Sequence, residues 1–282
     1  MKNILVATDF SNNAYCALFY AAKLLESKKC TFYLLNTYSE LTALKDKLLP
    51  GFGGQKELKQ LKTESKEKLE SVFHKIILDT ENPNHVFETI SQKGELVTVI
   101  GKKLEELNID LLVMGNKGLT EAADIFFGSN TIQTISKIKT CPVLAVPGEM
   151  NFVPPKEIAF VTDFEKDCNQ KSIAPLMDVA SITKAAIRVI HINEKKVLTA
   201  TQESNKKLLE QCLQAVEHTF HVAHEFDDKA KVIDVILKKL KIDMYVMVNY
   251  RHNLFEKLTH EPIIKDVSMY VDLPFLILPS RD

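Results

Sequence analysis

The sequence predicts an α/β protein made of two tandem, doubly wound domains, each with a five-stranded parallel sheet. Two observations support this prediction: short apolar runs alternate with amphipathic helical segments, and three segments of the first half recur in the second half in the same order. A chain of 282 residues, 45% of them hydrophobic, is long enough to bury two cores.

The repeat is visible as three pairs of matched segments. Three prolines and a glycine interrupt the apolar pattern at 147–155, so we place the boundary there, with domains at 1–149 and 150–282. The second copy is shorter, and we expect the missing residues to correspond to a loop at 39–56 of the first. The matched pairs are KNILVATDF at 2–10 with KEIAFVTDF at 156–164, NIDLLVMG at 108–115 with KIDMYVMV at 241–248, and CPVLAVP at 141–147 with LPFLILP at 273–279.

Each copy is expected to contain five strands with helices between them. The apolar runs are continuous rather than alternating, which is typical of parallel strands that helices cover on both faces. Ser11 or Asn12 can cap the first helix. In the first copy the expected strands are 4–7, 31–35, 86–90, 111–114 and 143–146, and the expected helices are 14–25, 55–72, 96–107 and 130–138. In the second copy the strands are expected near 158–162, 187–191, 219–224, 244–248 and 275–278.

The fourth strand of the first copy runs into a glycine-containing loop that suits a phosphate group. Gly115 stands at the strand end, where a glycine lets a ligand approach the backbone without meeting a Cβ atom, and Gly118 can take a positive φ in the turn. Gly128 and Ser129 precede a helix whose N–H groups and dipole attract an anion. Ser129 and Thr131 add hydroxyl donors at that end. This combination predicts a nucleotide site.

The opposite wall of this site is expected to come from the first strand. Ligands of doubly wound sheets bind beyond the carboxyl ends of the strands, where the strand order reverses, so Ala7, Thr8 and Asp9 would face the loop. Asp9 could accept hydrogen bonds from ribose hydroxyls or hold a metal ion such as Mg2+, and Thr37 could border the base. The structural alternative is that the glycines mark turns and Asp9 caps a helix. The dinucleotide pattern GxGxxG and the P-loop pattern GxxxxGK(S/T) are both absent.

These features resemble those of the universal stress proteins, here in a tandem arrangement. Nucleotide-binding members of that family carry G-x2-G-x9-G-(S/T) after strand four, and 115–129 matches this motif in full, although Asn130 stands where the family often has a small apolar residue. The resemblance covers nearly the whole chain. It implies a strand order of 3-2-1-4-5 in each domain and an adenine nucleotide as ligand, without separating ATP from ADP or AMP. By resemblance the base and ribose would be contacted by Ala7, Thr8, Asp9 and Thr37, and the ribose and phosphates by Met114, Gly115, Gly118, Gly128, Ser129, Asn130 and Thr131.

The second copy lacks the glycine loop. No glycine occurs in 150–282, and Val248 stands in place of Gly115. Glu261 falls near the place of the Gly-Ser pair, where its charge would repel a phosphate. We therefore predict that the second copy binds no ATP and packs on the first.

The way in which the copies pack is implied by the family, which pairs subunits through the fifth strand. By resemblance, 143–146 would lie beside 275–278 within one chain, and a homodimer is a further assembly that the resemblance allows.

Composition argues against several other functions. A net charge of -1 gives no electrostatic case for nucleic acid, and no apolar run approaches the roughly 18 residues of a membrane span. Five cysteines without a CxxC pair fit reduced thiols in a cytoplasmic protein. His218 and His224 would lie on one face of a strand and His221 on the other, which disfavours a shared zinc ion.

The sequence thus favours a protein whose stress or signalling role depends on a bound adenine nucleotide. A second hypothesis is a slow ATPase, or an enzyme that phosphorylates itself at Ser129 or Thr131. No general base other than Asp9 and no arginine finger in the loop are evident, so no catalytic residue is assigned. A third hypothesis is an interaction scaffold with an empty site.

Overall fold

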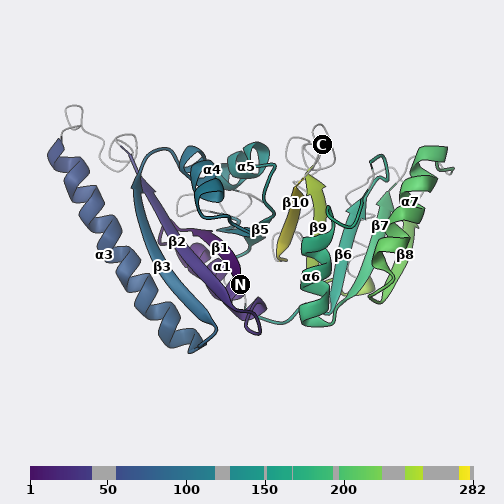
Figure 1. Cartoon of the computed structure of the whole chain (residues 1–282), viewed down its shortest axis with the longest axis horizontal. Helices are drawn as coiled ribbons and strands as arrows, with labels where there is room; N and C mark the ends of the chain where they lie inside the picture. The colour runs from purple at the N-terminus through teal and green to yellow at the C-terminus, as the bar shows by residue number, and fades with distance from the viewer. Residues whose placement is uncertain are drawn as a thin grey trace.

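The computed structural model describes residues 1–39, 55–117, 128–148, 151–166, 168–192, 197–223, 239–249 and 273–279. They form one ten-stranded sheet, in which the two halves of the chain lie side by side (Figure 1). The first half contains β1 (Lys2–Ala7), α1 (Asn12–Leu24), β2 (Cys30–Tyr38), α3 (Gln55–Thr80), β3 (His85–Lys93), α4 (Leu96–Glu106), β4 (Leu111–Gly115), α5 (Ser129–Lys137) and β5 (Val143–Val146). The second half contains β6 (Glu157–Thr162), α6 (Ala174–Thr183), β7 (Ala186–Ile192), α7 (Ala200–Leu213), β8 (His218–Ala223), β9 (Met244–Asn249) and β10 (Phe275–Pro279).

The two halves have the same strand order. It is β3-β2-β1-β4-β5 in the first half and β8-β7-β6-β9-β10 in the second, and every strand pair within a half is parallel. Counted from its own first strand, each half therefore has the order 3-2-1-4-5, which confirms the predicted α/β fold. The order reverses between the first and fourth strands of each half, so the carboxyl ends of β1 and β4 form a topological switch point.

The fifth strands join the two halves. β5 and β10 pair antiparallel, with Phe275 opposite Ala145 and Ile277 opposite Val143, which is the neighbourhood expected for these strands. Each strand covers an edge that the other would leave unpaired. The two outer strands of the sheet are consequently β3 and β8.

Helices cover both faces of this sheet. On one face, a core cluster combines side chains of α1, α6 and α7, among them Leu18, Leu176 and Leu209. On the other face, a second cluster combines Ile100 of α4 and Ile135 of α5 with strand residues of both halves. Figure 1 shows α4 and α5 together on the first half. Because both clusters continue across the β5–β10 pair, burial of apolar side chains holds the halves together.

Several elements extend beyond their predicted bounds, among them α3, β2 and β3. Helix α3 continues to Thr80 rather than ending at residue 72, because Ile76 is fully buried and extends the buried stripe that Leu69 begins. Strand β3 continues to Lys93, which pairs with Tyr38 of β2, so polar residues prolong this ladder. Most of the loop expected at 39–56 lies outside the described residues.

The recurring Thr-Asp-Phe triplet forms the same turn at the ends of β1 and β6. The Thr8 hydroxyl oxygen accepts a hydrogen bond from Phe10 N at 3.0 Å, and that of Thr162 accepts one from Phe164 N at 3.1 Å. Phe10 and Phe164 both have left-handed backbone conformations, with φ of 67° and 56°. A phenylalanine rarely adopts this conformation, so the repeat preserves a turn that the surrounding contacts must stabilise.

The recurring Ile-Asp pair also has a structural role. Asp110 accepts a hydrogen bond from Asn3 N at 2.7 Å, and Asp243 accepts bonds from Lys156 N and Glu157 N at 2.8 and 3.0 Å. In each half this carboxylate ties the start of the fourth strand to the start of the first.

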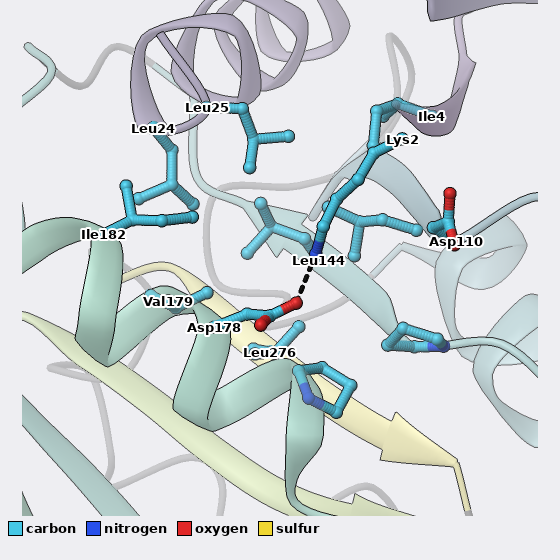
Figure 2. Close-up of a pocket in the computed structure, with 13 residues that line it drawn as sticks. Lys2, Ile4, Leu24, Leu25, Asp110, Leu144, Asp178, Val179, Ile182 and Leu276 are labelled. Carbon is cyan, nitrogen blue, oxygen red and sulfur yellow. Dashed lines mark hydrogen bonds and ion pairs between the residues drawn. The ribbon is translucent and has the colours of Figure 1, made fainter. Parts of the chain in front are cut away.

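A further contact between the halves lies at the amino end of β1. Lys2 forms an ion pair with Asp178 of α6, and Leu24 of α1 lies close to Ile182 of α6 (Figure 2). The cavity lined by these side chains has a volume of about 40 Å³. Ligand pockets for molecules of nucleotide size occupy roughly 300 Å³ or more, so this cavity is no candidate for a nucleotide.

Candidate functional site

The candidate site lies at the carboxyl ends of β1 and β4, where the strand order of the first half reverses. Val6 of β1 pairs with Val113 of β4, so Ala7 and Met114 come next at the same level of the sheet. Both side chains belong to the core cluster that Ile135 of α5 also joins. The sheet thus brings these two predicted residues together on the face that α5 covers.

Helix α5 begins with a glycine. Its N-cap residue is Gly128, with φ of −64° and ψ of 154°, which has no side chain to make a cap hydrogen bond. By contrast, side-chain oxygens of Ser11 and Glu95 cap α1 and α4. Since the first-turn N–H groups of a helix have no acceptor within the helix, the start of α5 is suited to an external anion.

The glycine loop is closed at its base by a backbone hydrogen bond. Gly128 N donates to Asn116 O at 2.7 Å, which places the start of α5 beside the end of β4. Ser129 and Asn130 are exposed at this end of the helix. Gly118 lies outside the described residues.

Thr131, which was predicted to offer a hydroxyl to the ligand, makes a hydrogen bond within the first half. Its side chain is 3% exposed, and its hydroxyl donates its proton to Gly115 O at 2.9 Å. A hydroxyl has one proton, so in this conformation Thr131 does not donate to a phosphate. Instead it ties the first turn of α5 to the end of β4.

The glycine at the end of β4 also has a packing reason. A Cβ atom at Gly115 would lie 3.1 Å from Asn13 C, 3.2 Å from Asn13 O and 3.2 Å from Ala14 N. The backbone of α1, rather than a ligand, therefore occupies the space that this glycine leaves open. Helix α1 can pack this closely only against a residue without a side chain.

The second half avoids this restriction because its helix begins later. In the repeat alignment Asn12, the first residue of α1, corresponds to residue 166, whereas α6 begins at Ala174. Among the described residues, the helix turn that lies against Gly115 has no counterpart in the second half, where Val248 is buried at the end of β9.

The residues after β1 make contacts of their own. Asp9 Oδ1 accepts a hydrogen bond from Ser11 N at 3.0 Å, so this carboxylate closes the turn before α1, whereas the residue that caps the helix is Ser11. Asn36, which the sequence analysis missed, donates from Nδ2 to Thr8 O at 2.8 Å. Its signal was its position at the end of the second strand, next to Thr37. Thr37 is half-buried in β2, two residues beyond the last β2 residue that pairs with β1.

In the second half, His191 takes the place of Asn36. The Nδ1–H of His191 donates to Thr162 O at 2.9 Å, and the ring stacks on Phe164 with 4.4 Å between centroids. The His191 side chain is 1% exposed. Gln202 of α7 donates to the backbone carbonyl of the aspartate in the same triplet at 2.9 Å. Side chains of the protein itself thus pack against this strand end.

Comparison with known proteins now decides the family. Residues 1–147, more than half of the chain, match the universal stress protein family. The chain belongs to the universal stress protein family. A universal stress protein of Methanocaldococcus jannaschii is 31% identical over 157 residues, which cover 51% of this chain and 94% of that protein.

Solved structures of universal stress proteins share the fold along nearly the whole chain. One from Archaeoglobus fulgidus superposes with a TM-score of 0.70 at 18% identity and covers 98% of each chain. Another from Pseudomonas aeruginosa superposes with a TM-score of 0.57 at 13% identity, covering 99% of this chain and 93% of that one. At these identities the likeness shows the fold alone.

Three further observations concern only the described residues. None of their helices is both long and apolar enough to cross a membrane. They contain no group of three or more His, Cys, Asp or Glu side chains placed to hold a metal ion, and His224 of the histidine triplet lies outside them. All five cysteines are described, and all are free thiols, as predicted.

Proposed function

We propose that the first domain, residues 1–149, binds an adenine nucleotide (ATP, ADP or AMP), and that its occupancy governs a stress or signalling role. The observation that carries this proposal is the start of α5, a helix with a glycine N-cap at the switch point of a parallel sheet. The same segment completes the G-x2-G-x9-G-(S/T) motif, and membership of the universal stress protein family supports the same function.

In this proposal the phosphates lie at the N-terminus of α5. Ser129 and Asn130 supply backbone N–H groups there, next to Gly128, whose own N–H is bonded to Asn116 O, and the helix dipole favours negative charge. Thr131 acts indirectly, by holding α5 against β4. With a triphosphate bound, Mg2+ would neutralise part of the phosphate charge, and Asp9 is a carboxylate at this end of the sheet.

The base and ribose would lie against the ends of the strands. Ala7, Thr8 and Asp9 follow one another at the end of β1, and Thr37 stands near the end of the neighbouring β2. Met114 lies on β4 at the level that follows Val6–Val113, so it would border the same ligand.

We propose that the second domain, residues 150–282, binds no nucleotide. Val248 replaces the glycine at the end of β9, and the buried ring of His191 packs on Phe164 at the end of β6. Asn205 of α7 donates to Phe164 O at 2.8 Å, so a carbonyl that a ligand might use is already bonded. The pairing of β5 with β10 would replace pairing between subunits at this edge, and a homodimer would need another surface.

We favour a binding protein over an ATPase or a self-phosphorylating enzyme. Catalysis at the γ-phosphate needs a group that orients or deprotonates the nucleophile. The carboxylate of Asp9, the one base identified for this role, accepts a hydrogen bond within its own turn. An interaction scaffold with an empty site would lack bound nucleotide altogether.

The test is mass spectrometry of small molecules released by denaturation after mild purification. We expect about one adenine nucleotide per chain, as one intact site requires. The same measurement on Ser129→Asp/Asn130→Asp should detect none, because two carboxylates would occupy the anion position at exposed residues that tolerate substitution. Absence of nucleotide from the unsubstituted chain, with no binding of added ATP, ADP or AMP, would leave only the scaffold.

A further inference from the structure

The contacts at the two ends of α5 suggest a role for the second half of the chain, one that rests on the proposed function. Helix α5 has only 9 residues, fewer than an isolated helix needs for stability in water. Its position therefore depends on its contacts. At the N-terminal end, Thr131 ties it to Gly115 within the first half.

The C-terminal end of α5 is held by a residue of the second half. Ile135 O is one of the last four carbonyls of the helix, for which the helix itself supplies no donor. Asn249, the last residue of β9, donates from Nδ2 to this oxygen at 2.5 Å. Ile135 is fully buried and Asn249 is 3% exposed, so water cannot readily replace this bond.

Lys139 completes the contact. Its ammonium group donates to Asn249 Oδ1 at 2.7 Å and lies 3.5 Å from Ile135 O. Both polar atoms of the Asn249 side chain are therefore bonded to the first half, which fixes the orientation of the amide. A positive charge at this place also interacts favourably with the C-terminal end of the α5 dipole.

The repeat explains where Asn249 comes from. Met114-Gly115-Asn116 at the end of β4 corresponds to Met247-Val248-Asn249 at the end of β9. In the first half, Asn116 O accepts the hydrogen bond from Gly128 N that closes the glycine loop. In the second half, the matching asparagine instead contacts the helix that follows the glycine loop of the first half.

We propose that Asn249 is a positioning residue for the nucleotide site, and that through it the second half controls the phosphate-binding helix. The same helix has its N-terminus at the phosphates and Ile135, near its C-terminus, against Asn249; the rise from Ser129 to Ile135 is about 9 Å at 1.5 Å per residue. If nucleotide binding shifts α5, it changes the strength of the contact between α5 and Asn249. Because such coupling is reciprocal, a change in that contact then changes the affinity for nucleotide by an equal free energy.

The experiment compares Asn249→Ala and Lys139→Met with a control that breaks a different contact between the halves. Lys2→Met removes the ion pair with Asp178 at the amino end of β1, which lies away from α5 (Figure 1). Affinity for ATP, ADP and AMP is measured by calorimetry, and hydrogen exchange of the α5 amides is measured without nucleotide. We expect the Kd of Asn249→Ala to rise roughly 3- to 10-fold, the size of one lost hydrogen bond, with faster exchange in α5. Lys139→Met should show a smaller change in the same direction, and Lys2→Met should show neither.

Each other outcome contradicts a particular step. If the hydrogen exchange of the α5 amides is unchanged in Asn249→Ala, the residue does not anchor the helix, and this conclusion does not depend on whether the chain binds nucleotide. Faster exchange with an unchanged Kd overturns the link to the site. An equal loss of affinity in Lys2→Met assigns the effect to general loosening between the halves. If the unsubstituted chain binds no adenine nucleotide, the proposed function fails, and with it the part of this inference that concerns affinity. Lys139→Met, which alters a half-buried side chain, decides the question if Asn249→Ala does not fold.

Discussion

Substitution of Gly115 by alanine separates a structural role of this glycine from a ligand-binding one. The added Cβ atom would lie 3.1–3.2 Å from backbone atoms of Asn13 and Ala14, closer than ordinary van der Waals contact. Backbone atoms of a packed helix cannot rotate away, so α1 must shift. Overpacking costs about 1–3 kcal/mol, and the lower backbone entropy of unfolded alanine offsets about 0.5–1 kcal/mol of that. We therefore expect Gly115→Ala to lower the free energy of unfolding by about 1 kcal/mol, and the bulkier Gly115→Val by more.

Gly101→Ala is the matched control. Gly101 lies within α4, and an added Cβ there would have no neighbour within 4 Å. Alanine has the higher helix propensity, so this variant should gain about 0.5–1 kcal/mol. Urea denaturation of both variants should show a difference of about 2 kcal/mol in the free energy of unfolding, with the same dependence on urea concentration. The reasoning is refuted if Gly115→Ala is as stable as the unsubstituted chain. If it then also fails to bind nucleotide, a ligand rather than α1 requires this glycine.

Three further predictions concern charge, hydrogen bonding and pH. Asn130→Asp should abolish or strongly weaken nucleotide binding while leaving thermal stability equal or slightly higher, because the exposed carboxylate suits the helix N-terminus but repels phosphate. Gln211→Glu, the same charge change at an exposed position of α7, should leave the nucleotide affinity measured by calorimetry unchanged. Thr131→Val should lower the free energy of unfolding in urea by about 1–2 kcal/mol, because Gly115 O loses its donor, and a value near zero would show that this bond is unimportant. Burial holds the pKa of His85 below 6.5, so the unfolded chain takes up the proton first and the free energy of unfolding should fall as the pH drops through about 6.5. His85→Gln should flatten the pH dependence of the unfolding free energy measured in urea between about pH 7.5 and 5.5, and an unchanged slope would assign the effect to other groups.

The order of strands and helices could be predicted because burial patterns are local. Apolar runs such as 4–7 and 143–146 are continuous wherever helices cover both faces of a parallel sheet, and this holds whatever the neighbours are. The predicted end of α3 was wrong by two turns because Ile76, which is fully buried, was not counted in the apolar stripe. The apolar stripe itself continues to Ile76, so the same burial argument accounts for the longer helix.

The roles of the matched motifs depended on contacts that sequence spacing does not contain. The Thr-Asp-Phe triplet was predicted at a strand end. Its left-handed phenylalanine recurs in the half that lacks the glycine loop, and so does the hydrogen bond that its aspartate accepts, from Ser11 N in the first half and from Glu165 N in the second. The triplet therefore has a structural role in both halves, and it belongs to a candidate site only in the first half, where the glycine loop lies next to it.

The sequence by itself determined the α/β repeat, the two copies of the fold and the position of the glycine loop at the end of β4, because these follow from residue types and periodicity along the chain. Only the tertiary structure decided why Gly115 must be a glycine, where the Thr131 proton goes, and that Asn249 of one half holds a helix of the other. The physical reason is that each of these depends on the distance between segments far apart in the chain. That distance is set by the packing of helix on sheet, and local sequence does not encode it.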